Sequence, residues 1–148
     1  MIRLTSFTLS LLVCLSSLAC QSYTTGLQQS VGKTDEISAI AALHSIAAAQ
    51  RTYSLARGGD YGTFQQLCEG GYLDSRFNSS QPEIKDYVLT MDVRQKSGNE
   101  SPGRFSCNAD PVRPGKQAGR HFYIDSTSTE IHVNPGQPAT AGDAALQP

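Results

Sequence analysis

The chain has 148 residues, with 12 basic side chains, 13 acidic side chains and three histidines. This length suits one domain. The near balance of charge, without a run of like charges, argues against nucleic acid and acidic lipid surfaces as partners.

Residues 1–19 have the pattern of an export signal. Arg3 provides the positive start, residues 4–18 contain no charged side chain, and Ser17 and Ala19 supply small residues at the end. The segment is short for a membrane span, which needs about 20 apolar residues. We expect it to be cleaved from an exported protein.

The residues before Cys20, Ser-Leu-Ala, resemble the lipobox of bacterial lipoproteins. That resemblance implies a diacylglycerol on the Cys20 thiol and a further acyl chain on its freed amine, which is enough lipid for stable anchoring. Gln21 stands where many inner-membrane lipoproteins have aspartate, so the resemblance favours the outer membrane. The alternative is an ordinary secretory signal that leaves Cys20 as a free thiol.

Residues 20–33 are polar, low in charge and interrupted by glycine, so we expect a lipid-anchored tether. A single amphipathic helix is then predicted over Asp35–Arg57, capped by Thr34 and ended by Gly58. Its apolar face is expected to comprise Ile37, Ile40, Leu43, Ile46, Ala47, Ala49 and Tyr53.

Turn residues dominate positions 58–80, within which Thr63 can cap a short helix ending at Glu69. Four short strands with alternating polarity follow. We predict them at Asp86–Arg94, Arg104–Ala109, His121–Asp125 and Ile131–Val133. The predicted fold class is therefore α+β, with the long helix packed on a small four-stranded antiparallel sheet. The globular domain is expected to span residues 34–133, and the Pro- and Gly-containing tail 134–148 is expected to be disordered.

Four cysteines are present, at positions 14, 20, 68 and 107. Cys14 would leave with the signal and Cys20 would be lipidated, so the even pair Cys68 and Cys107 is expected to form a disulfide in an oxidising compartment. Cys107 falls on the inward face of its strand, towards the segment that carries Cys68. A two-cysteine metal site is the alternative, but it lacks further ligands at suitable spacing.

Parts of the helix, the following loop and the last strands share a family likeness. The helix carries Ala42-Leu43, Ile46, Ala49-Gln50 and Tyr53, and the following loop carries Gly59, Tyr61, Leu67, Gly71, Leu73 and Asp74. The later segment reads Ala-Asp-Pro-Val over 109–112, followed by Phe122, Tyr123 and Asp125. Over about residues 36–133 the chain resembles type IV pilin-like and pseudopilin proteins. The resemblance implies a helix packed on a small antiparallel sheet. In place of a pilin leader and its apolar anchor, this chain has the lipoprotein-type signal, which implies a pilin-type domain on a lipid anchor.

The sequence gives no catalytic constellation, so neither a catalytic residue nor a cofactor or metal is assigned. His44 is expected beside the apolar face of the helix. His121 and His132 fall on neighbouring strands near Asp125 and Glu130, where metal binding is a minor alternative. Gln50, on the helix face expected to meet the sheet, is predicted to hydrogen-bond loop backbone.

These observations predict a non-enzymatic, lipid-anchored envelope protein that acts through protein contacts, without nucleic acid or a small-molecule substrate. Its partner would be another envelope protein or a pilus or secretion-system component. One alternative is a pseudopilin or minor pilin subunit of a type IV pilus or type II secretion system. Another is a small periplasmic metal-binding protein or hydrolase.

Overall fold

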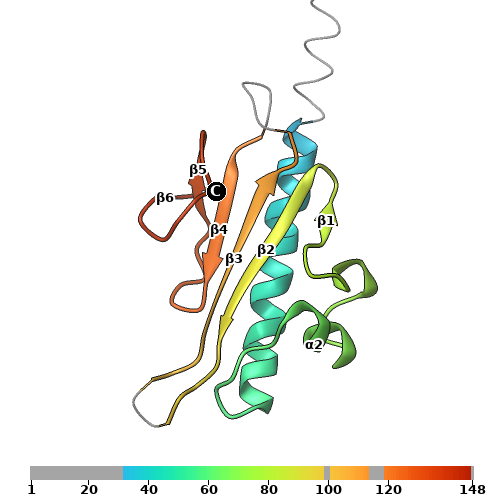
Figure 1. Ribbon diagram of the computed structural model, residues 1–148. Coiled ribbons are helices and arrows are strands. Elements are labelled where there is room, and N and C mark those ends of the chain that lie inside the picture. Colours follow the sequence, from blue (N-terminus) through green and yellow to red (C-terminus); the bar gives the residue numbers. More distant parts are fainter. Residues whose placement is uncertain (1–31, 99–100, 114–118, 148) are drawn as a thin grey trace, which may run out of the picture.

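The computed structural model describes residues 32–98, 101–113 and 119–147 (Figure 1). The predicted signal, the lipidation site Cys20 and nearly all of the predicted tether lie outside these residues.

A long helix occupies residues 32–56, close to its predicted extent. Its buried side chains recur every three or four positions, which turns one side of the helix towards the sheet. They are Ala39, Ala42, Leu43, Ile46, Ala49, Gln50 and Tyr53. After the helix, Gly58 and Gly59 adopt φ angles of 67° and 103°, and Gly59 N donates to Ser54 O at 2.9 Å. Positive φ explains why glycine stands at both positions.

Ile37 departs from the predicted apolar face, because 67% of it is exposed. It lies nine residues before the buried Ile46, and at about 100° per residue this places the two side chains on opposite sides of the helix. Because alanines occur on several sides of this helix, the sequence alone did not determine which side faces the sheet.

The sheet is antiparallel and its six strands follow one another in chain order (Figure 1). The strands are β1 (Glu83–Ile84), β2 (Tyr87–Arg94), β3 (Arg104–Pro111), β4 (His121–Asp125), β5 (His132–Asn134) and β6 (Ala144–Ala145). The prediction of a four-stranded sheet is therefore wrong. The four predicted strands correspond to β2–β5, and the sheet has a further short strand at each edge.

The two additional strands have two residues each, too few to show a periodic pattern. The turn between β1 and β2 contains Lys85, whose φ of 57° is unusual for a residue other than glycine and gives no turn signal in the sequence. β6 lies in the tail that was expected to be disordered. The structure instead pairs Val133 with Ala144, and Ala139 is only 2% exposed.

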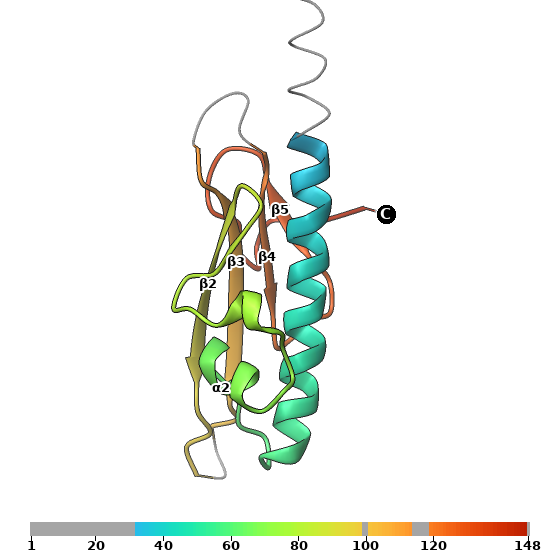
Figure 2. The same ribbon diagram turned by 90° about the vertical axis from the view of Figure 1, so that its right-hand side faces the viewer.

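The helix and the sheet form two layers, with the helix lying along one face of the sheet (Figure 2). Inward-facing residues of β2, β3 and β4 meet the buried side of the helix. They include Tyr87, Leu89, Phe105, Cys107, Ala109, Phe122 and Ile124. Within the described ranges, no helix combines the length and apolar character needed to cross a membrane.

A short helix, α2 (Phe64–Glu69), and a 3-10 turn, η1 (Ser75–Phe77), lie beside the long helix (Figure 2). The predicted cap of α2 is confirmed. Thr63 Oγ1 accepts from Gln66 N, and Gln66 Oε1 accepts from Thr63 N, a reciprocal capping box. Phe64 and Leu67 are buried, so α2 fixes the loop that leads from the helix to the sheet.

Candidate functional site

The outer face of the sheet, turned away from the long helix, is polar along β3, β4 and β5. Its half-buried side chains alternate with the core residues, as expected for a sheet with one face on a core. We call this set the outer-face cluster; it comprises Ser106, Asn108, Asp110, His121, Tyr123, Asp125, His132 and Asn134. A cluster of this composition is where proton-transfer or metal chemistry would be sought.

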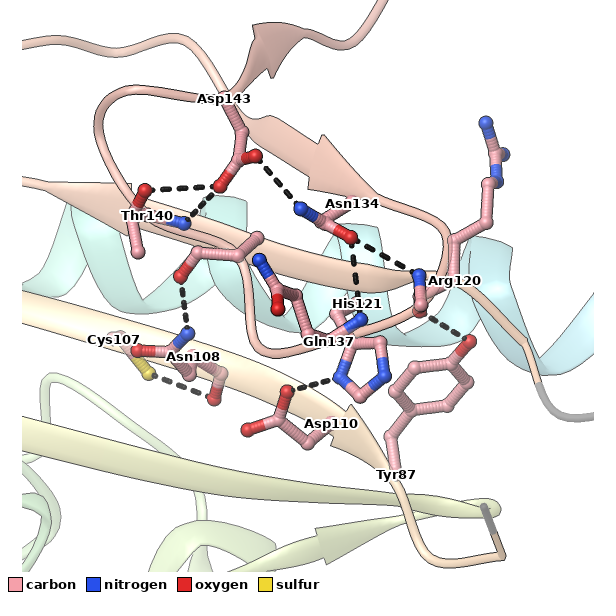
Figure 3. Close-up of polar contacts among 12 residues, drawn as sticks. Tyr87, Cys107, Asn108, Asp110, Arg120, His121, Asn134, Gln137, Thr140 and Asp143 are labelled. Atoms are coloured by element: carbon pink, nitrogen blue, oxygen red, sulfur yellow. Dashed lines mark hydrogen bonds and ion pairs between the residues drawn. The ribbon is translucent and has the colours of Figure 1, made fainter. Parts of the chain in front are cut away.

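Asp110 and His121 form the closest polar contact in the cluster (Figure 3), with 2.6 Å between Asp110 Oδ1 and His121 Nδ1. Their side chains are 29% and 17% exposed. The strand register pairs Ala109 with Phe122, so Asp110 and His121 are the next pair of opposite residues on β3 and β4. A carboxylate on Nδ1 is also how a catalytic base is oriented. Among the described residues, no group forms a hydrogen bond with His121 Nε2.

The C-terminal segment is attached to this face through Asp143 (Figure 3). Its carboxylate accepts from Asn134 Nδ2 at 2.7 Å, and from Thr140 N and Oγ1 at 2.7 and 2.9 Å. The bond from Asn134, followed by those from Thr140, holds the pKa of Asp143 below its usual value. Asn108 Nδ2 adds a bond to Ala139 O at 2.8 Å. The segment thus replaces solvent as the partner of several outer-face groups.

The two histidines of the predicted minor metal site are held by different partners. His121 binds Asp110, whereas His132 Nδ1 lies 2.8 Å from the backbone oxygen of Asp143. Asp125 accepts bonds from Tyr123 and from the turn that follows it. Across the described ranges, no three His, Cys, Asp or Glu residues are grouped so as to hold a metal ion.

Cys68 and Cys107 are separate thiols in the structure, so the disulfide expected from the sequence is not formed there. Cys68 Sγ is directed to Asp74 O at 3.3 Å, while Cys107 is fully buried on the inward face of β3. Burial raises the pKa of the Cys107 thiol, and burial with the nearby Asp74 and Glu69 raises that of Cys68. The disulfide expected from the sequence stays a prediction, which thiol chemistry can test.

Gln50 confirms its predicted role. The side chain is fully buried, its Nε2 donates to Gly62 O at 2.6 Å, and its Oε1 accepts from Gly62 N at 2.9 Å. One amide therefore satisfies both backbone groups of Gly62, which fixes the loop after the helix against the core. His44 is exposed on the opposite side of the helix.

Sequence reasoning missed Asp110 and Asp143. For Asp110 a signal was available, because a hairpin with Cys107 and Ile124 opposite each other must bring Asp110 towards His121. Asp143 gave no comparable signal, because it lies in a segment whose composition resembles a linker.

Comparison with family models, with curated proteins and with solved structures finds no match to this chain.

Proposed function

We propose that this chain is an exported envelope protein, anchored by lipid at Cys20, that acts through contacts with other proteins. The anchor rests on the lipobox resemblance at Cys20. The contacts rest on the outward side of the long helix, and this second feature is the observation that carries the proposal.

The outward side of the helix is long and almost uncharged. Arg51 is the only residue with a formal charge between Ile37 and Leu55. Those two apolar residues are 67% and 82% exposed, with small exposed residues such as Ala41 and Ala48 between them. A helix face that meets only water usually carries charges on that side. Small residues also let a partner backbone approach closely, so this face suits a helix of a partner protein.

The resemblance to pilin-like proteins supports the same class of function, because those domains act as subunits of envelope assemblies. The long helix lying along one face of an antiparallel sheet is compatible with that resemblance. The proposal differs in the anchor, which would be lipid at Cys20 and not an apolar helix.

Two measurements test the anchor. Intact mass spectrometry of the chain extracted from membranes is expected to show a chain that begins at Cys20 and carries acyl mass. Cys20→Ser is expected to move the protein from the membrane to the soluble fraction. An unacylated chain, or membrane association that survives Cys20→Ser, would refute the anchor.

Site-specific photocrosslinking in cells tests the contact face. A photoreactive residue at Ala48 is expected to crosslink to a defined partner, whereas one at Thr90, which is exposed on the outer face of β2, is not. The Ala48 crosslink is expected to disappear in the Ile37→Glu, Leu55→Glu double variant. Equal crosslinks from both positions, or none from Ala48, would contradict the assignment.

A further inference from the structure

Two arginines lie directly opposite each other on neighbouring strands. Arg94 at the end of β2 pairs in register with Arg104 at the start of β3, and both are exposed on the outer face of the sheet. β2 runs away from the start of the long helix, so the pair lies at the opposite end of the molecule (Figure 1). Like charges that face each other across two strands destabilise a sheet. The pairing is therefore a cost to the fold that an anion would remove.

Among the described residues, nearby carboxylates offset this charge only in part. Asp92 lies 3.9 Å from Arg94, but the two side chains are 75% and 82% exposed, so water weakens their attraction. Asp125 already accepts bonds from Tyr123 and Thr127. Within the described ranges, Arg104 forms no ion pair.

The arginines border a hollow of about 270 Å³ whose lining also includes Asp92, Asp125, Ser106, Tyr123 and Thr127. On the other side of the β4–β5 turn lies a second hollow of about 320 Å³, bordered by Arg51, Leu55 and Tyr61. Phe105 and Asp125 line both hollows, so the two are adjacent. One hollow therefore offers guanidinium and hydroxyl donors beside two carboxylates. Its neighbour is lined mostly by polar residues and also offers the side chains of Leu55 and Tyr61 with a third arginine.

We propose that Arg94 and Arg104 bind a carboxylate on an acidic segment of a partner protein, and that the hollow beside Leu55 takes an apolar side chain of the same segment. Guanidinium groups pair with carboxylates through parallel hydrogen bonds, which gives geometry as well as charge. The exposed Leu55 in the adjacent hollow favours a peptide over an anionic polysaccharide, which has no apolar side chain to place against it. This surface shares Leu55 with the helix face of the proposed function, whereas Arg94 and Arg104 lie on the sheet; it rests on that proposal in requiring a protein partner.

Binding can be measured by fluorescence anisotropy with the full purified chain. The probe is a labelled peptide of alternating glutamate and leucine, at about 0.15 M salt. We expect saturable binding that weakens at least about tenfold in the Arg94→Gln, Arg104→Gln double variant. The matched control is Arg76→Gln with Arg113→Gln, which removes the same charge from two arginines that already have aspartate partners. It is expected to change the dissociation constant less than about twofold.

A third variant separates binding from folding. Arg104→Glu replaces the like-charged pair with an opposite pair, so it is expected to raise the midpoint of thermal unfolding while it abolishes peptide binding. If Arg104 affected peptide binding only through the stability of the fold, a variant with a higher unfolding midpoint would not lose binding.

Several outcomes would overturn the proposal: absence of saturable binding by the wild-type chain, equal weakening by the control variant, or tighter binding of a sulfated polysaccharide to the same arginines. The arginine variants leave the helix face unchanged, so photocrosslinking from Ala48 in these variants reads the helix contact separately. A crosslink that persists while peptide binding is lost shows that only the arginine surface is affected.

Discussion

Glu36 and Arg120, 84 positions apart in the chain, form a two-pronged ion pair between the long helix and the start of β4. Glu36 Oε2 accepts from Arg120 Nη2 at 2.8 Å and from Nε at 3.2 Å, and Oε1 accepts from Arg120 N at 2.9 Å. The Glu36 side chain is only 15% exposed. Tyr87 Oη donates to Arg120 O at 2.9 Å, so β2 joins the same contact.

Removal of Glu36 is expected to destabilise the fold. Glu36→Ala leaves Arg120 N and its guanidinium without their acceptor, and we expect the free energy of unfolding to fall by about 1–2 kcal/mol in urea denaturation. Asp86→Ala is the control, because Asp86 and Arg113 are 3.4 Å apart and both largely exposed. That variant is expected to change the free energy by less than about 0.5 kcal/mol. Equal decreases in the free energy of unfolding in the two variants would show that the contact at Glu36 stabilises the fold no more than an exposed ion pair does.

Gln50 gives a larger expected effect, because its loss leaves two buried backbone groups of Gly62 without partners. Gln50→Leu has similar volume, and its unfolding free energy is expected to fall by about 2–4 kcal/mol. Gln65→Leu, at an exposed position of α2, serves as the control and is expected to be nearly neutral. A Gln50→Leu variant as stable as the wild type would mean that the loop at Gly62 rearranges without cost.

Thiol chemistry distinguishes the free cysteines of the structure from the disulfide expected from the sequence. In a chain with Cys14 and Cys20 replaced by serine, Cys107 is expected to resist a thiol reagent at pH 8 until the protein unfolds. Its burial limits access, and its raised pKa leaves little thiolate. Cys68, which is partly exposed, is expected to react first. If neither thiol reacts in urea until a reductant is added, the two cysteines are bonded.

The elements with a repeating pattern were predictable from the sequence. The long helix, the cap at Thr63 and the strands corresponding to β2–β5 follow from periodicity and turn chemistry, which depend on neighbouring residues. Gln50 was predictable for a related reason, because an amide on a buried helix face must find partners. The position of Ile37 was not, because an alanine-rich helix leaves its rotation against the sheet to tertiary packing.

The edges of the sheet and the candidate site depend on contacts between distant segments. β6 consists of two alanines, and the segment before it is attached through Asp143 and Asn134. A prediction from composition alone gives disorder for this segment, because it contains few apolar residues. The contact between Asp110 and His121 could be predicted only from the register of β3 and β4, which the sequence suggested but did not specify. Residues 1–31 lie outside the described structure, so the expectations for the signal and Cys20 remain predictions.

The attachment of the C-terminal segment is expected to weaken in acid. The pKa of Asp143 is lowered in the folded chain, first by Asn134 and then by Thr140. A lowered carboxyl pKa means that the contribution is fully present above the ordinary aspartate value of about 4, and is lost as pH falls through the lower folded value. The Leu146 amide, which donates to Ile131 O at 2.7 Å, reports on this attachment.

Hydrogen exchange over residues 136–147, expressed relative to intrinsic exchange rates, measures the effect. Protection is expected to decline as the pH falls below about 4 in the wild type. In Asp143→Asn it is expected to be low already at pH 7 and to change little with acid. Asp92→Asn is the control, because Asp92 is 75% exposed and lies at the other end of the sheet. If Asp143→Asn retains full protection, the segment is held by Ala139 and Leu146 packing alone, and Asp143 does not control it.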